Sequence, residues 1–593
     1  MKSRYFLVFL GLLFLVPFFT SQSFTDPFLV PRMLYFQGMA AILLVVGLFV
    51  FRSKQGKLSF TFPDLLLLAF VLYISLSTIL IDGSTSHNLF FISWVLLVGV
   101  YFLVKEVLKH GGGNGLILIG VLLICGMVEA GFGVLQHFNL IDNGYSNFGA
   151  TGTWLNPGPY AIYLSSTLPF VLALFLFRKK TWIKKLSGII LLIILIALPL
   201  TESRTGWIAA FLGCGVVILS KYYDVVATFF KHRPRALTLI ILGCVILGFA
   251  GYELYQYKID SVHGRLNIYQ TAWNIFMDHP LLGVGFDNYA PVHSEYQSAY
   301  FHANPEINEV AYSADNVEYV FNEYLQMLAE LGIIGLLVFL VLIFFLGKLS
   351  LGAIRNSNRD PILMGAIGSL IGIMTSALFS YPFHEVSILV ILILDIAIIS
   401  SVDSSSIFQL SLSRSVDQAV KFGISLMCVW FLWSRFERAN AEMQWKRAYA
   451  MLQRGNVGRA MEEYEAIYPV MKQNELFLFN YGAELSYQGQ YQKSITILTE
   501  TLPRLNDQDV QLFLAMSYWG NGDKDLAEQH FIKAIHIIPY KYLPRYRLML
   551  FYLNNGEQAK AQKQAKLIAD LQPKVPSETV DQIKKEANNV LEK

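Results

Sequence analysis

Two arginines stand where a negatively charged substrate could bind. Arg204 lies in the short polar segment TESR (201–204) between two apolar runs, and Arg265 opens the segment GRLNIYQTAWNIFMDHP (264–280). A guanidinium group offers a planar fork of N–H donors that can hold a phosphate or diphosphate by two hydrogen bonds. The alternative for Arg204 is an interfacial arginine that extends its charge to the lipid headgroups.

Polar residues also stand directly before an apolar run, in VFNEYLQMLAELGIIG (320–335). Asn322 and Glu323 would lie at the end of a membrane span, where an amide and a carboxylate can line a polar cleft. The carboxylate is also a candidate general base. We expect Gln326 and Glu330, further along the segment, to meet water and lipid headgroups.

A histidine in a short hairpin is the third candidate. The segment SYPFHEVSIL (380–389) places His384 and Glu385 between two apolar runs, where burial can tune an imidazole. We favour His384 over His302 as a general base, because a hairpin between two spans holds a side chain more rigidly than a long loop. The alternative is an interfacial histidine bonded to Glu385.

The composition is that of a protein that crosses a membrane many times. The chain has 593 residues, of which 54% are apolar and 15% charged, and its mean hydropathy is +0.46. These values place it among polytopic membrane proteins. The four cysteines all lie in apolar runs, so we expect no disulfide bond and no thiolate metal site.

Thirteen apolar runs are candidate membrane spans, which need about 20 residues each. They lie near 5–20, 33–51, 62–81, 88–104, 115–137, 158–177, 185–201, 205–220, 236–254, 331–348, 361–381, 384–402 and 418–434. Lysine and arginine are enriched in cytoplasmic loops. An N-terminus inside satisfies this rule, because only Arg32, Arg204, Lys258 and Arg265 of the membrane part then face outward.

Two extramembrane parts follow from this topology. A long outer loop, about 255–330, holds Arg265 at the start of an amphipathic helix. Asp278-His279-Pro280 ends that helix, and glycines at 283 and 285 permit a tight turn. The second part begins near 435 and is also outside. We therefore expect an all-α protein with 12–13 membrane helices in 1–434 and an extracytoplasmic domain in 435–593.

The C-terminal part repeats. Gly455, Gly489, Gly522 and Gly556 recur at intervals of 34, 33 and 34 residues. A small residue follows each glycine five positions later. The pattern resembles the tetratricopeptide repeat, a helical hairpin that stacks on its neighbours. Such an array either stiffens the chain as a spacer or binds a protein partner.

Four segments together carry a resemblance to a family. They are GTWLNPGPYAIYLS (152–165), SRTGW (203–207), GR…W…DHPLLGVGFDNY (264–289) and FNEYLQMLAELGIIG (321–335). Their order and spacing resemble the O-antigen ligase and polymerase superfamily, which includes lipopolysaccharide O-antigen ligases and bacterial protein O-oligosaccharyltransferases. The resemblance covers roughly 150–400.

The resemblance implies a metal-independent glycosyltransferase without a cofactor, in the bacterial cytoplasmic membrane. It would transfer a glycan from a polyprenyl (undecaprenyl) diphosphate carrier to an acceptor hydroxyl at the outer face. Two arginines, Arg204 and Arg265, could stabilise the departing diphosphate without a metal. The acceptor hydroxyl would need a general base.

The chain departs from the family pattern at one position. The family has His-Asn before its Tyr-Leu pair, with the histidine as the proposed base, whereas this chain has Phe321 before Asn322. A phenyl ring cannot accept a proton, so the base must lie elsewhere or the acceptor is activated mainly by its position. His384, Glu323 and His302 are the candidates.

Several alternatives stay open at the level of sequence. Ligation to a lipid, polymerisation of repeat units and transfer to a protein hydroxyl share the same pattern. A transporter with a repeat scaffold is the alternative of another class, but it should show an internal duplication and charges at the membrane midplane. Glycan, acceptor, oligomeric state and the partner of the repeats are not encoded in a recognisable form.

Overall fold

A computed structural model describes residues 2–50, 57–82, 89–109, 114–142, 148–230, 259–356, 359–411 and 413–592. The chain divides into two compact units. The first comprises Met1–Tyr257, Phe321–Met327 and Ile333–Lys446, and the second comprises Lys258–Val320, Leu328–Gly332 and Arg447–Lys593. Most described residues are helical and very few lie in strands, which confirms the predicted all-α class.

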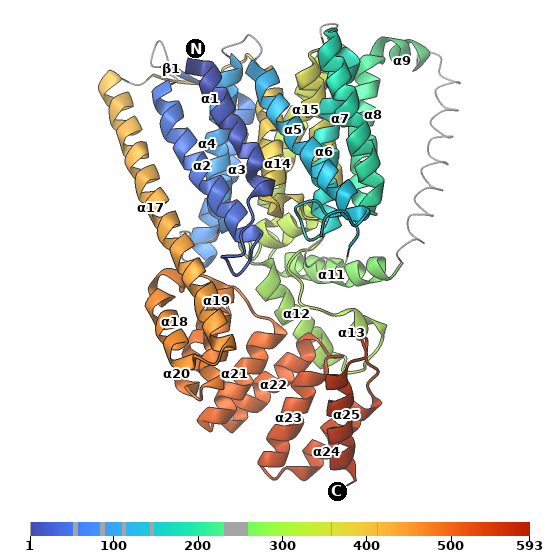
Figure 1. Ribbon diagram of the computed structural model, residues 1–593, viewed down its shortest axis with the longest axis vertical. Helices are drawn as coiled ribbons and strands as arrows, with labels where there is room; N and C mark the ends of the chain where they lie inside the picture. The colour runs from blue at the N-terminus through green and yellow to red at the C-terminus, as the bar shows by residue number, and fades with distance from the viewer. Residues whose placement is uncertain are drawn as a thin grey trace. The chain divides into compact units, whose positions relative to one another are not determined.

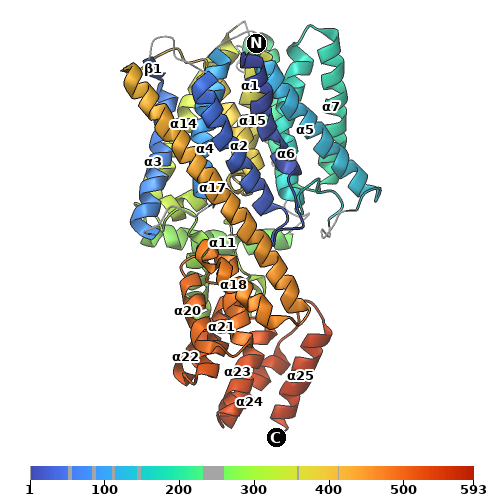
Figure 2. The same cartoon turned by 60° about the vertical axis from the view of Figure 1, so that its left-hand side comes forward.

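The first unit is a bundle of apolar helices. Within the described residues, nine helices are long and apolar enough to cross a membrane. They are α2 (Leu29–Val50), α3 (Phe62–Asp82), α4 (Leu89–Lys109), α5 (Asn114–His137), α6 (Pro157–Phe177), α7 (Thr181–Leu200), α8 (Arg204–Lys221), α14 (Glu323–Arg355) and α17 (Arg414–Gln453). Figures 1 and 2 show the helices of this unit running side by side.

Shorter helices complete the first unit. They are α1 (Lys2–Gly11), η1 (Leu12–Phe18), α9 (Tyr223–Phe230), α15 (Pro361–Ser376), η2 (Pro382–His384) and α16 (Val386–Ser400). Strands β1 (Lys57–Phe60) and β2 (Phe408–Ser411) pair antiparallel, with Phe60 opposite Phe408. Each predicted span except 236–254, which falls outside the described residues, coincides with a helix.

The interior of the bundle lies around α6, α15 and α16. Every residue of α16 is buried. Where α8 and α15 cross, a Cβ built on Gly213 would lie 2.6 Å from the carbonyl oxygen of Gly368, and one on Gly368 would lie 2.7 Å from that of Gly213. Small residues at such crossings let two membrane helices approach closely. The close contact with α8 therefore holds α15 in place, and with it the hairpin that follows α15.

Polar caps begin the helices that bear the candidate residues. The side chain of Asn322 accepts hydrogen bonds from the backbone N–H groups of Tyr324 and Leu325, both at 3.1 Å, at the start of α14. Ser203 caps α8 and Asp360 caps α15 in the same way. A side-chain oxygen at the N-cap satisfies N–H groups that the first helical turn leaves unpaired.

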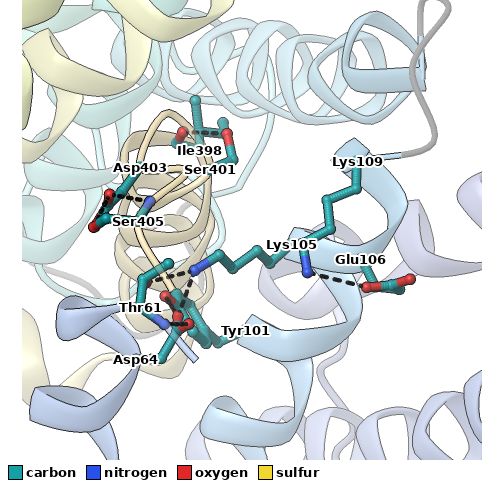
Figure 3. A network of polar contacts seen from close by, with 10 residues as sticks. All are labelled: Thr61, Asp64, Tyr101, Lys105, Glu106, Lys109, Ile398, Ser401, Asp403 and Ser405. Carbon is teal, nitrogen blue, oxygen red and sulfur yellow. Dashed lines mark hydrogen bonds and ion pairs between the residues drawn. The ribbon is translucent and has the colours of Figure 1, made fainter. Parts of the chain in front are cut away.

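A buried ion pair joins α3 and α4 at the ends that the predicted topology places inside (Figure 3). Lys105 Nζ lies 2.6 Å from Asp64 Oδ1 and donates to Thr61 Oγ1 at 2.9 Å. Tyr101 donates a further hydrogen bond to the same carboxylate. A buried charge is costly unless it is paired. Here Lys105 and Asp64 pair with each other, and this contact holds α3 and α4 together.

The second unit joins the outer loop to the C-terminal helices. The loop forms α11 (Ile259–Asp278), α12 (Tyr289–Ala303) and α13 (Glu309–Ser313). As predicted, α11 ends at Asp278, but it begins six residues before Arg265. The C-terminal helices are α18 (Val457–Met471), α19 (Glu475–Tyr487), α20 (Tyr491–Thr501), α21 (Gln508–Asn521), α22 (Lys524–Ile537), α23 (Tyr542–Asn554), α24 (Gln558–Asp570) and α25 (Glu578–Leu591).

The recurring glycines lie at the turns of helical hairpins. Gly489, Gly522 and Gly556 follow α19, α21 and α23, and their φ angles are +70°, +93° and +78°. Glycine adopts this left-handed conformation without the steric cost that other residues meet. The predicted helical repetition is therefore present in the structure.

The outer loop packs against these hairpins within the second unit. Gln297 on α12 donates to the carbonyl oxygen of Ile537 at 2.7 Å. The ring of Tyr312 stacks on that of Tyr540, with centroids 6.0 Å apart. Tyr312 and Ile307 also contact the apolar core of the last hairpins. The loop and the C-terminal helices therefore share a core.

A second crossing involves the glycine turn of the loop. Gly283 (φ +69°) and Gly332 (φ +62°) are both left-handed, and Gly332 breaks the regular geometry of α14. Val284 N donates to Ala329 O at 3.0 Å, and Gly285 N donates to Glu330 O at 2.9 Å. A Cβ on Gly283 would lie 2.3 Å from the carbonyl of Glu330. Only glycine allows the two backbones to meet so closely.

Candidate active site

The hairpin between α15 and α16 brings His384 to the start of α14. His384 Nδ1 lies 3.4 Å from Glu323 Oε1, and its Nε2 lies 3.2 Å from the amide nitrogen of Gln326. The imidazole is therefore held between a carboxylate and an amide, one at each ring nitrogen. The sequence prediction had proposed His384 and Glu323 as separate candidates, and the structure brings them together.

Backbone hydrogen bonds fix this arrangement. Glu323 Oε1 accepts from the backbone N–H of Phe383 at 2.6 Å, and the backbone N–H of Glu323 donates to the carbonyl of Ala377 at 2.8 Å. Glu323, Gln326 and His384 are all buried, at 2%, 3% and 8% exposure. Hydrogen bonds from both the start and the end of the segment 377–383 therefore hold it to the first turn of α14.

The contacts favour one form of the imidazole. A carboxylate beside Nδ1 favours a proton there, and an amide N–H beside Nε2 favours a lone pair on that nitrogen. In this form Nε2 can accept a proton, while the carboxylate stabilises the imidazolium that results. The group has the chemistry required of a general base.

Two sequence predictions at this segment were wrong. Gln326 and Glu330 were expected to meet water and headgroups, but both are buried. Gln326 contacts His384, and Glu330 Oε2 accepts the backbone N–H of Asp287 at 3.1 Å. The reason is that distant segments cover them, the hairpin of His384 over Gln326 and the turn of Asp287 over Glu330. The carbonyl of Asn322 bonds within the helix and its amide oxygen caps α14, so its place in a substrate cleft stays a prediction.

The two predicted diphosphate-binding arginines lie in different units. Arg204 is the first residue of α8 in the first unit, and Arg265 lies in α11 of the second unit. Both side chains are half-buried. Their joint action on one diphosphate stays a prediction. His302, the alternative base, lies on α12 with its ring 5.0 Å from that of His536.

A third arginine that the topology prediction places outside, Arg32, has a structural environment that the sequence did not reveal. Arg32 is 4% exposed, and its guanidinium donates to the carbonyl of Thr153 at 2.6 Å. It also lies over the ring of Trp154, 5.0 Å from the centroid. Thr153 in turn donates to Glu129 through its hydroxyl at 2.8 Å and its backbone N–H at 3.0 Å. The one available signal was that Arg32 is among the four outward bases.

This Arg32 group reaches the residue next to His384. The indole N–H of Trp154 donates to Glu385 Oε2 at 3.2 Å. The contacts of the imidazole described above are with Glu323 and Gln326, and the alternative expectation, in which Glu385 bonds His384, stays a prediction.

Phe321, at the family's histidine position, contributes no polar group. Its backbone is left-handed, with φ +58°. Its ring meets that of Tyr381 edge-on, with centroids 5.5 Å apart, and the hydroxyl of Tyr381 accepts from Asn156 at 3.0 Å. The hairpin that carries His384 therefore packs beside the position where a histidine is missing.

One protein family matches the part of the chain that contains both predicted arginines. The family model described as O-antigen ligase matches residues 189–340. This segment belongs to the O-antigen ligase superfamily. Arg204, Arg265 and the start of α14 lie inside the O-antigen ligase match, whereas His384 lies beyond its end. The apolar helices and this match together indicate a multi-pass membrane protein.

One curated protein is similar to this chain over part of its sequence. The teichuronic acid biosynthesis protein TuaE of Bacillus subtilis (strain 168) is 24% identical over 249 residues, which are 40% of this chain and 48% of TuaE. The chain therefore spans about half the length of this curated relative.

Two solved structures match less than a third of the chain. They are MamA from residue 41 to its end, from Desulfovibrio magneticus RS-1, and a double mutant of MamA RS-1. Both are 15% identical with a TM-score of 0.22, covering 28% and 29% of this chain and 89% and 92% of theirs. A TM-score this low carries no argument.

Proposed function

We propose that the protein transfers a glycan from a polyprenyl (undecaprenyl) diphosphate carrier to an acceptor hydroxyl, at the outer face of the bacterial cytoplasmic membrane. The observation that carries this proposal is the imidazole of His384 between Glu323 and Gln326. The O-antigen ligase match supports it, because that match includes both arginines and the first turn of α14.

The proposed reaction assigns a role to each group. The acceptor hydroxyl gives its proton to His384 Nε2 after displacing the amide of Gln326. The acceptor oxygen then attacks the anomeric carbon, and the bond from that carbon to the diphosphate oxygen breaks. Arg204 and Arg265 stabilise the negative charge on the departing lipid diphosphate. Glu323 stabilises the imidazolium until its proton passes to the solvent or the diphosphate.

The acceptor separates the members of this reaction class. TuaE is named for teichuronic acid biosynthesis, and this supports glycan synthesis over the transporter alternative. It also favours the repeat-unit polymerase as the second candidate, in which the acceptor is the growing polysaccharide. The C-terminal helices support a protein acceptor or an assembly partner only weakly, since part of their surface already binds the outer loop.

Reconstitution tests the proposal. The purified protein in proteoliposomes is given a glycan on undecaprenyl diphosphate, with a lipid, a polysaccharide or a protein as acceptor, and product is measured by mass spectrometry. Arg204→Ala and Arg265→Ala should each abolish transfer while expression persists. Lys180→Ala is the matched control, because this exposed lysine precedes α7 without a capping contact. Full activity in both arginine variants would refute the diphosphate role.

A further inference from the structure

A small polar pocket opens in the second unit between α11, α12 and α13. Its volume is about 80 Å³. A cavity needs roughly 10–15 Å³ to hold one water molecule, so this pocket has room for several waters or for much of one sugar ring. The volume therefore suits a single monosaccharide unit.

The residues that line the pocket are partly polar and partly apolar, and none of those in the described part of the chain carries a formal charge. Eight of the fourteen residues that line the pocket, within the described part of the chain, are amides, hydroxyls or tyrosines. Those most relevant to a ligand are Asn267, Gln270, Asn274, Tyr296, Gln297 and Tyr300. Amides both donate and accept hydrogen bonds, as sugar hydroxyls do. Without a lysine, arginine or histidine in the lining, the pocket offers no cation to a phosphate or a uronic acid.

Part of this lining is held in place by other contacts. Asn267 Nδ2 donates to Ser313 Oγ at 2.7 Å, which joins α11 to α13. Gln297 donates to the carbonyl oxygens of Asp315 and Ile537. Tyr296 donates its hydroxyl to Asp278. A pocket whose walls are already fixed loses less conformational entropy when a ligand binds.

The remaining residues form an accessible rim. Gln270 and Asn274 are exposed on α11, one turn apart, and Tyr300 on α12 is 45% exposed. A tyrosine ring offers an apolar face with a polar hydroxyl at its edge. The apolar face of a pyranose can stack on such a ring while its hydroxyls reach the two amides.

We propose that this pocket binds one uncharged sugar residue of the glycan substrate. This inference rests on the proposed transferase function and specifies its substrate. The 3.6-residue period of a helix places Asn267 and Asn274 on the opposite side of α11 from Arg265, so these two amides would contact a part of the glycan other than the diphosphate that Arg265 is proposed to bind. The pocket would hold a distant part of the glycan and so contribute to recognition rather than to chemistry.

A binding experiment tests the pocket independently of turnover. The full chain in lipid nanodiscs is mixed with glucose, galactose, N-acetylglucosamine or N-acetylgalactosamine, and with glucuronate as the charged probe. Saturation-transfer NMR then detects which free sugar binds. At least one neutral sugar should give a signal, and glucuronate should give none.

Variants assign the signal to the pocket. Tyr300→Ala and Asn274→Ala should each weaken binding about fivefold, which corresponds to the loss of one stacking contact or one hydrogen bond. Tyr300→Phe keeps the ring and should retain most of the binding. Tyr487→Ala is the matched control, since Tyr487 is an exposed tyrosine on α19 that does not line the pocket.

The outcomes separate the two proposals. Sugar binding that depends on Tyr300, in a protein without transferase activity, supports the pocket and contradicts the function. Normal transfer with no neutral sugar bound, or with binding unchanged in Tyr300→Ala and Asn274→Ala, overturns the pocket and leaves the function intact. A signal from glucuronate alone also overturns the proposal.

Discussion

The Nδ1 atom of His384 lies 3.4 Å from the Oε1 atom of Glu323, although the two residues belong to a hairpin and to the first turn of a different helix. The same carboxylate oxygen accepts the backbone N–H of Phe383. Glu323 therefore fixes both the hairpin and the ring that the hairpin carries. A substitution at Glu323 should therefore change the position of the His384 ring.

His384→Ala should lower kcat by about 10²- to 10⁴-fold, the usual contribution of a general base. The KM for the lipid-linked donor should change little, because the imidazole is proposed to contact the acceptor. Steady-state kinetics in proteoliposomes measures both quantities. His279→Ala, which removes an exposed histidine from the same protein, serves as the control. Wild-type kcat in His384→Ala would move the base to His302 or Glu323.

Glu323→Ala and Glu323→Asp test the carboxylate. Glu323→Ala should lower kcat, since the imidazole loses the group that orients it, and Glu323→Asp should restore part of the loss because it keeps the charge. Equal loss in both variants, with a lowered midpoint of thermal unfolding, would mean that Glu323 only stabilises the hairpin.

Arg32→Ala should destabilise the first unit. The guanidinium satisfies the carbonyl of Thr153 and lies beside Trp154, and its loss leaves a buried carbonyl unpaired near two carboxylates. We expect a cost of about 1–3 kcal/mol. Arg32→Lys should recover less than half, because an ammonium lacks the planar fork. Thermal unfolding in detergent measures the difference, and equal midpoints for Arg32→Ala and the parent would contradict the role.

Gly332→Ala should disrupt the junction between α14 and the loop. A Cβ at Gly332 would lie 2.2 Å from the carbonyl oxygen of Leu281, and its φ is +62°. Gly347→Ala, on the same helix, is the control, because a Cβ there meets nothing within 4 Å. That change should be neutral or stabilise α14 by up to about 1 kcal/mol. Increased proteolysis near 281–287 in Gly332→Ala alone is the expected readout.

Acid should destabilise the second unit through His293. Burial lowers the pKa of His293 from its usual 6.5 to about 4, so the unfolded chain binds a proton more readily than the folded one. Stability is therefore complete above pH 6.5 and is lost as the pH falls toward 4. His293→Leu should flatten this dependence in thermal unfolding measured from pH 7 to pH 4.5. Part of it should remain, because burial also lowers the pKa of His530 and His536 to about 4.

The contact between the outer loop and the C-terminal helices should depend on aromatic packing more than on charge. Lys533 and Glu295 form an ion pair at the surface, and such pairs contribute about 0–1 kcal/mol. Tyr312 stacks on Tyr540 and joins the core of the last hairpins. Tyr312→Ala should therefore expose the loop to protease far more than Lys533→Ala does. The reverse order would contradict this assignment.

Periodicity and composition were sufficient to predict where most helices of this chain lie. Apolar runs predicted every span that the structure describes, because membrane helices are defined by length and hydropathy. The glycine repeat predicted the helical hairpins, since each turn needs one left-handed residue. Spans and turns can be predicted because they depend on residues that are close together in the sequence.

The site was predicted only in part, because its contacts join distant segments. His384 and Glu323 were each identified by residue type, but nothing local indicated that one would orient the other. Gln326 and Glu330 were misassigned because the residues that they contact, His384 and Asp287, are 58 and 43 residues away in the sequence. Arg32 was visible as an outward base, yet its partners Thr153 and Trp154 lie more than a hundred residues later.

The composition of the second unit from Lys258–Val320, Leu328–Gly332 and Arg447–Lys593 has a consequence for biosynthesis. At translation rates of about 5–20 residues per second, the loop emerges tens of seconds before its partner hairpins. Ile307 and Tyr312 must meanwhile stay without the core that later covers them. A chaperone that shields this segment during that delay would raise the yield of folded protein, and shortening the delay by expressing the C-terminal helices first would have the same effect.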